Sequence, residues 1–257
     1  MRVRVRYEKT GKPRFISAID LGRVWERALR VADLPIAFSE GFSPHPRISF
    51  SDALPLGYAS TGEYAELVFA APILLEPAIA TLNAAFPPGV RVRQAVEVVE
   101  GAPKLAQWLR ASCWDMTYAD PAALPAAVDG ARAAETLPVA RERKGPGVTI
   151  DLRPAIHRIT ADHGLVRVVL HHVEPAVRPC EVHRALMSFR PGIPEPALIT
   201  RVAQGSPSTQ GLIEALSGEL VPSDPLAAAC SSTAPTRSPT ALTRSGRLGS
   251  TEQRQPS

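Results

Sequence analysis

Residues 1–32, MRVRVRYEKTGKPRFISAIDLGRVWERALRVA, decide the fold class. Residues 2–7 alternate arginine with valine or tyrosine, which is typical of a strand with one buried and one exposed face. Ser17 and Asp20 match a capping box in which aspartate stands where glutamate is usual. From Leu21 to Ala32, apolar residues then recur at i, i+3, i+4, i+7, i+8 and i+11. This spacing predicts an amphipathic helix directly after the first strand.

The pattern continues along the first 99 residues as β-α-β-β-α-β, the ferredoxin-like order. Pro35 ends the first helix, and Pro87-Pro88-Gly89 ends the second. The elements expected after the first helix are extended segments at 36–38 and 48–50, a strand at 64–69, a helix at 74–86 and a strand at 90–99.

The second half repeats this order more faintly. It predicts a strand at 114–118, a helix at 121–134, paired strands at 148–152 and 165–170, a short helix at 179–189 and a closing strand at 198–203. We therefore expect an α+β protein of two tandem ferredoxin-like (βαββαβ) units with antiparallel sheets. The expected boundaries are residues 1–105 and 106–220. Residues 221–257, rich in Ser, Thr, Pro, Ala and Arg, are expected to form a disordered tail, because they bury too little apolar surface to order.

Composition narrows the protein class. The 257 residues carry a formal charge of +4, but residues 1–50 alone hold ten Lys or Arg against five Asp or Glu, a net of +5. No stretch is apolar enough to span a membrane, and residues 1–6 do not begin a secretory leader. Three widely separated cysteines predict a reducing, cytoplasmic location and no disulfide framework. They also cannot by themselves ligate an iron–sulfur cluster or a structural zinc.

Arginines gather on one face of the predicted first sheet. If Val3, Val5, Val92 and Val96 face the helices, the arginines share the open face. These residues are Arg2, Arg4, Arg6, Arg91 and Arg93. Like charges on adjacent strands are destabilising, so something should compensate them. Glu66 and Glu97 are the internal candidates, and a bound anion or an acidic partner surface is the external one. Tyr64 is the one aromatic residue expected there, which gives little support to base stacking.

The loop at 41–47, GFSPHPR, holds a histidine between two prolines, which fixes an extended backbone and points His45 outward. Ser43, His45 and Arg47 are therefore candidate binding residues. A catalytic alternative makes His45 a general base, with Arg14 and Arg47 stabilising a phosphoryl charge. Because no second His, Ser or Cys is placed to complete a catalytic set, a structural or ligand-contacting loop is the preferred interpretation.

A second basic segment lies at 141–147, RERKGPG, ahead of a strand. Arg141, Arg143 and Lys144 on a flexible turn suit phosphate contact, although such turns are commonly plain hairpin tips. His171-His172 and Cys180-x-x-His183 lack a second ligand pair, so we expect no metal site. The sequence also lacks a Walker loop, a dinucleotide fingerprint and a G-x-S-x-G elbow. No catalytic residue is assigned beyond the His45 alternative.

Several strings resemble the DUF2344 family, also called radical SAM-linked or radical SAM-associated proteins. They are GKPRFIS at 11–17, DL at 20–21, ERALR at 26–30, GFSPHPRISF at 41–50, ALPLG at 53–57, DLR at 151–153 and ITR at 199–201. The resemblance runs from residue 1 to about 203 and is strongest over 11–66. It implies a radical SAM protein as the partner, often one with a cobalamin-binding region. SAM, the iron–sulfur cluster and cobalamin would then belong to that partner, and this chain would hold no cofactor.

Three hypotheses follow. The first is a non-catalytic recognition module that acts with a radical SAM enzyme, either binding an anionic substrate such as structured RNA or docking the enzyme. The second is a metal-independent RNA-cleaving enzyme that uses His45. The third is a protein–protein adaptor that binds no nucleic acid.

Overall fold

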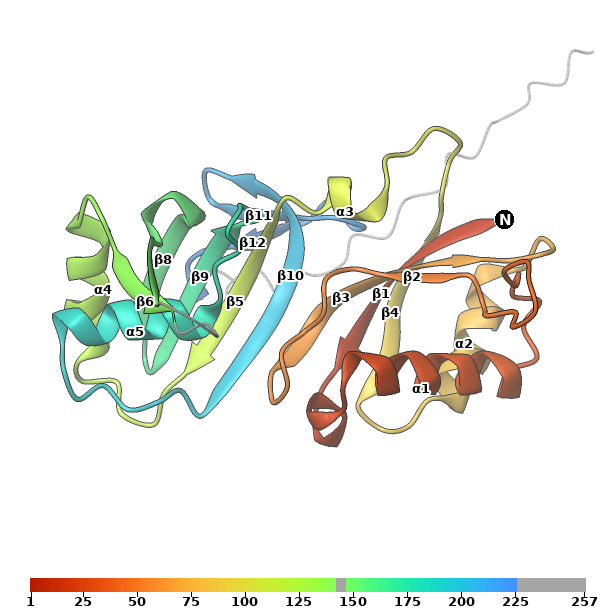
Figure 1. Ribbon diagram of the computed structural model, residues 1–257, viewed down its shortest axis with the longest axis horizontal. Coiled ribbons are helices and arrows are strands. Elements are labelled where there is room, and N and C mark those ends of the chain that lie inside the picture. The colour runs from red at the N-terminus through yellow and green to blue at the C-terminus, as the bar shows by residue number, and fades with distance from the viewer. Residues whose placement is uncertain (142–146, 226–257) are drawn as a thin grey trace, which may run out of the picture.

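The computed structural model describes residues 1–141 and 147–225 (Figure 1). It is a mixed α+β protein built on one large, mostly antiparallel sheet. The predicted α+β class and antiparallel strand pairing are therefore confirmed. The predicted disordered tail from 226 onward and the basic residues 142–146 lie outside the described residues. None of the helices in the described part is long and apolar enough to cross a membrane.

The first half places its strands in the order β4-β1-β3, with β2 on the far edge of β3. Helix α1 lies between β1 and β2 in the chain, and α2 lies between β3 and β4. The elements are β1 (Arg2–Lys9), the 3-10 helix η1 (Lys12–Phe15), α1 (Ala18–Val31), β2 (Ile48–Phe50), β3 (Ala59–Val68), α2 (Leu75–Ala85) and β4 (Val90–Glu97).

The second half has the equivalent order, β10-β5-β9-β8, with α4 between β5 and β8 in the chain and α5 between β9 and β10. Its elements are α3 (Leu105–Trp108), β5 (Ala111–Thr117), α4 (Leu124–Ala133), β6 (Pro138–Arg141), β7 (Val148–Asp151), η2 (Arg153–Ala155), β8 (Ile156–Asp162), β9 (Leu165–His171), α5 (Pro179–Phe189), β10 (Leu198–Ser208), β11 (Gly211–Glu214) and β12 (Leu220–Pro222).

Helix α1 forms as its sequence pattern predicts. The Ser17 hydroxyl oxygen accepts a hydrogen bond from the Asp20 amide at 3.1 Å, which satisfies a backbone group at the helix start. The apolar stripe then faces the first core, where Trp25 is fully buried. The basic stripe, Arg23, Arg27 and Arg30, is exposed to solvent.

The face assignment of β4 differs from the prediction. Val92 lies opposite Tyr7, but Gln94 lies opposite Arg6, so Arg93 is an extra residue in β4. Such a bulge reverses the faces of the residues beyond it. Val96 therefore lies opposite Arg4 on the arginine face, and not beside Val92 on the helix face. A strictly alternating sequence carries no sign of this extra residue.

The two halves share one sheet where two sheets were expected. Strand β2 covers only residues 65–67 of the edge of β3, which leaves the edge at Ala59 and Ser60 free. This free edge pairs with β10 in parallel, Ala59 with Thr200 and Ser60 with Arg201. The result is a single ten-stranded sheet that runs through both halves (Figure 1).

The predicted pairing of 148–152 with 165–170 is wrong. Strand β7 pairs with β6 in a separate two-stranded sheet, and β9 lies between β5 and β8. Because β9 already has a neighbour on each edge, it has no edge left for β7.

The structured part of the chain extends beyond residue 221, where the tail was predicted to begin. Strand β12 pairs with β11, and the Ser223 amide donates to the Gln210 carbonyl at 2.9 Å.

Candidate functional site

The arginine face of β1 is largely neutralised from within. Glu66 on β3 accepts hydrogen bonds from Arg2 at 2.7 Å and from Arg4 at 2.8 Å. On the neighbouring strand, Arg93 pairs with Glu8 at 2.7 Å. Of the two acidic residues expected to compensate these charges, Glu66 therefore does so, whereas Glu97 lies exposed opposite Val3.

Other parts of the chain cover this face. The Arg4 guanidinium lies 4.8 Å from the centre of the Trp108 ring in α3 and donates to the Pro103 carbonyl. Arg6 donates to the carbonyls of Thr61 and Val202, and it lies 3.8 Å from the buried Glu214. The face is therefore not the open surface that the sequence pattern predicts. Arg91 remains exposed, without an ion pair among the described residues.

The pKa of Glu66 reflects these contacts. Its partial burial by itself raises the pKa, but the hydrogen bonds and charges of Arg2 and Arg4 outweigh it and hold the pKa below its ordinary value. Glu66 is thus ionised at neutral pH and fixes both arginines in place.

A buried charge cluster occupies the junction of the two halves, and sequence reasoning missed it. The Arg201 side chain is 1% exposed, and its two terminal nitrogens bond both carboxylate oxygens of Asp52, at 3.1 and 3.0 Å. Glu63 lies 3.4 Å from the same guanidinium, which also stacks 4.6 Å above the Trp114 ring. The resemblance strings ITR and ALPLG, which contain Arg201 and begin next to Asp52, were the only sequence signal.

Lys9 belongs to the same cluster. Burial raises the pKa of Glu63 and lowers the pKa of Lys9, while the opposite charges nearby limit both shifts. The Lys9 ammonium donates to the carbonyl of Ile16 at 2.9 Å. Lys9, Glu63, Asp52 and Tyr7 line a small cavity of about 70 Å³, so ionisable groups surround a space near the junction.

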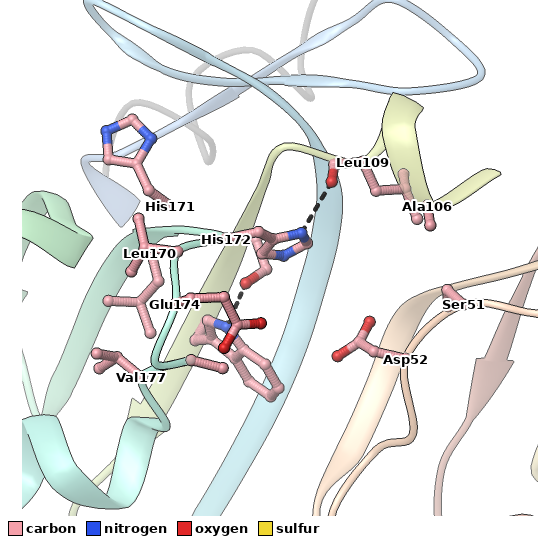
Figure 2. A pocket seen from close by; sticks show the side chains of 13 residues that line it. Ser51, Asp52, Ala106, Leu109, Leu170, His171, His172, Glu174 and Val177 are labelled. Atoms are coloured by element: carbon pink, nitrogen blue, oxygen red, sulfur yellow. Dashed lines mark hydrogen bonds between the residues drawn. The ribbon is translucent and has the colours of Figure 1, made fainter. Parts of the chain in front are cut away.

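A larger pocket of about 400 Å³ opens beside this cluster, between the two halves. In Figure 2 the side chains of Asp52 and Glu174 point toward one another from opposite sides of the pocket. The His172 ring lies on the side of Leu109, whose carbonyl it bonds. Trp114 and Ser112 belong to its floor, where the indole N–H donates to the Ser112 hydroxyl at 2.7 Å. A loop after β2, strand β5 and the segment after β9 together form this pocket.

The His45 loop is exposed. The His45 amide donates to the Ser39 hydroxyl at 3.0 Å, and the Ser39 amide donates back to the His45 carbonyl at 2.8 Å. These bonds close the loop and leave Ser43, His45 and Arg47 at the surface, consistent with an outward-facing loop.

Arg14 is distant from that loop. It lies near the Lys9 end of β1, since the Lys9 ammonium bonds the nearby carbonyl of Ile16. The His45 loop lies at the other end, because Ile36 bridges Phe69, whose amide bonds the Met1 carbonyl. With about 3.3 Å per residue, β1 separates the two by roughly 25 Å. The structure therefore does not bring His45 and Arg14 together as one catalytic set.

The remaining predicted residues occupy other surroundings. Arg141 makes two hydrogen bonds with Glu181, at 2.6 and 2.8 Å, and also donates to the Ala176 carbonyl. Arg143 and Lys144 lie outside the described residues, as does Cys230. In the described ranges, no three His, Cys, Asp or Glu side chains gather as a metal site.

Two comparisons with known proteins complete the description. Residues 2–179 match a protein family described as "Uncharacterized protein conserved in bacteria (DUF2344)". No curated protein matches the chain.

Proposed function

The chain belongs to the DUF2344 family, and from this premise we propose that it is a non-catalytic recognition module that docks a radical SAM enzyme. The resemblance of its sequence strings to radical SAM-associated proteins motivates the choice of partner. The cysteines support an accessory role, since Cys113, Cys180 and Cys230 are too far apart in the sequence to form a cluster-binding triplet. In this proposal the partner supplies SAM, the iron–sulfur cluster and any cobalamin.

We further infer that each half is a ferredoxin-like unit. The equivalent strand orders β4-β1-β3-β2 and β10-β5-β9-β8 support this inference, as does the position of one helix after the first strand and one after the third in each half. The fold provides surfaces for recognition but does not by itself imply an activity.

The observation that carries the docking proposal is an exposed apolar surface beside η1, which we call the Phe15 surface. Phe15 and Leu56 are each 63% exposed, and Ile19 in the first turn of α1 is 72% exposed. Leu56 is held near Phe15 because the next amide, that of Gly57, donates to the Arg14 carbonyl at 3.0 Å. Exposed apolar side chains gathered in this way mark interaction sites.

Positive charge borders the Phe15 surface. The Arg14 guanidinium stacks on the Phe15 ring at 4.6 Å, and Lys12 in the same 3-10 helix is exposed. The basic stripe of α1 continues along the adjoining helix. An acidic protein surface with apolar side chains at its centre complements this arrangement.

RNA binding by the sheet has weaker support. Arg2, Arg4 and Arg6 already bind carboxylates or carbonyls, so their charge is not free for phosphates. RNA cleavage by His45 has weaker support too, because Arg14 lies at the opposite end of β1.

Affinity capture tests the docking proposal. The full chain is tagged and purified from its native host with and without Phe15→Ser plus Leu56→Ser. We expect the unmodified chain to capture a radical SAM protein, identified by mass spectrometry, and the double variant to lose at least about 90% of it, since hot-spot residues dominate binding. Leu74→Ser is the matched control, because Leu74 is 79% exposed and lies in the segment before α2.

Two results would contradict the proposal. One is equal capture by the double variant and the unmodified chain. The other is capture that nuclease treatment abolishes, which would assign the surface to RNA.

A further inference from the structure

The pocket between the two halves shares no lining residue with the Phe15 surface and has the properties of a small-molecule site. Its volume of about 400 Å³ falls within the range of about 300–1,000 Å³ that is usual for such sites. Loops from both halves form its walls, and β5 forms its floor. Pockets at the junction of two packed units are common binding sites.

The pocket has apolar walls. Trp114, which is 5% exposed, contributes to the floor, and Leu109, Leu170 and Val177 line the sides. These side chains can cover the apolar part of a ligand and remove it from water.

Two polar groups that face the pocket, Glu174 and His172, present hydrogen-bond acceptors. Glu174 has no ion-pair partner among the described residues, and its carboxylate points across the pocket toward Asp52 (Figure 2). His172 bonds the Leu109 carbonyl through Nδ1 at 2.9 Å. That bond requires the hydrogen on Nδ1, so in the neutral ring Nε2 is left as an acceptor. A matching ligand must therefore supply donors.

Ser112 gives independent evidence of a missing partner. It is 4% exposed and lines the pocket, and its oxygen accepts the hydrogen of the Trp114 indole at 2.7 Å. Its own hydroxyl hydrogen has no acceptor in the described part of the chain. Buried polar groups are normally satisfied, so an acceptor on the body of the ligand, such as the π face of an aromatic ring, would complete the set.

We propose that this pocket binds a small organic amine. Its amino group donates to the Glu174 carboxylate and to Nε2 of His172, and its apolar body lies against Trp114. Asp52 adds a second carboxylate at the opposite wall, although Arg201 already holds it. The described residues that line the pocket include no lysine or arginine to pair with a carboxylate or phosphate ligand.

Ligand-observed NMR on the full chain tests this, with tryptamine as the probe and indole-3-acetate as its matched opposite. Both carry the same indole ring, but one bears an ammonium group and the other a carboxylate. We expect saturation transfer to tryptamine and not to indole-3-acetate. Glu174→Gln should weaken tryptamine binding about tenfold, as the loss of a charge-assisted hydrogen bond predicts. Glu135→Gln, at an exposed site after α4, should leave it unchanged.

A second variant guards against misfolding effects. Ala176 is exposed and lines the pocket, so Ala176→Phe should fill part of the space and abolish binding while the thermal midpoint stays unchanged. Equal transfer to both indoles, no transfer to tryptamine at millimolar concentration, or unchanged binding in both pocket variants would overturn the proposal. Partner capture through the Phe15 surface is measured separately, so either proposal can fail alone.

Discussion

Arg201 shows how a single side chain joins the two halves of this protein. It comes from β10, yet its partners Asp52 and Glu63 come from the first half and Trp114 comes from β5. Buried ion pairs add little stability over apolar replacements, but removing one partner leaves the other charge buried and unpaired. The buried Glu63 therefore gains its Arg201 partner only when the two halves dock correctly.

Replacing Arg201 tests this directly. Arg201→Met should lower the free energy of unfolding by about 3–5 kcal/mol, because it removes the guanidinium beside the buried Glu63. Urea titration followed by tryptophan fluorescence measures the change. The control Arg27→Met, on the exposed face of α1, should stay within about 0.5 kcal/mol. Similar losses in the two variants would argue against the cluster.

Glu66 gives a pH-dependent prediction. Because its pKa is lowered in the folded state, its contribution to stability is fully present above the unfolded pKa and is lost as pH falls through the folded pKa. Glu66→Gln should therefore flatten the decline in unfolding free energy below about pH 4.5. Denaturant titrations between pH 3 and 6 measure this, with Glu76→Gln as the exposed control. An identical decline in Glu66→Gln and the unmodified chain would refute it.

At the scale of elements, the contact between β3 and β10 depends on close backbone approach. A Cβ on Gly62 would lie 2.5 Å from the Cα of Ala203 and 2.7 Å from the Val202 carbonyl oxygen. Thr61 and Gln204 add hydrogen bonds across the same contact, at 3.0 and 2.9 Å. Glycine is needed here for space, since its φ is not in the left-handed region.

Two alanine substitutions distinguish the steric requirement at Gly62 from the general cost of glycine in a regular element. Gly62→Ala should destabilise the protein by about 1–3 kcal/mol, because backbone atoms must move to admit the methyl group. Gly22→Ala in α1 should instead stabilise it by about 0.5–1 kcal/mol, since nothing lies within 4 Å and alanine favours the helix. Thermal unfolding should give shifts of opposite sign. Equal signs would contradict the close contact.

At the scale of the molecule, the continuous sheet and the Arg201 cluster couple the two halves. Each half has its own large apolar core, one around Trp25 and the other around Val168. Two separate cores would allow separate unfolding, but opening the junction would break the pairing of β3 with β10 and the contacts of Arg201 with Glu63 and of Tyr64 with Gln204. We therefore expect the halves to unfold together.

Calorimetry measures this cooperativity. A single transition with equal calorimetric and van't Hoff enthalpies is expected for the full chain. Arg201→Met should broaden or split the transition, because it weakens the junction and leaves both cores intact. Two resolved transitions in the unmodified chain would show that the halves are independent.

The sequence by itself determined the local elements. Apolar periodicity and a capping box predicted α1 closely, and the arginine–valine alternation predicted β1, because these signals depend on neighbours a few residues apart. A helix was also predicted at the residues that form α5. Glu66 was also foreseen as a partner for the strand arginines.

Only the tertiary structure decided how distant segments meet. It set the bulge at Arg93, the pairing of β7 with β6, the joining of two sheets through β3 and β10, and the pocket beside Asp52. Each depends on which strand edges remain free and on which side chains need a partner once the cores have formed. The basic face of β1 illustrates the difference. Its arginines are evident in the sequence, but their neutralisation depends on Glu66 and Glu214, which lie about 60 and 200 residues away along the chain.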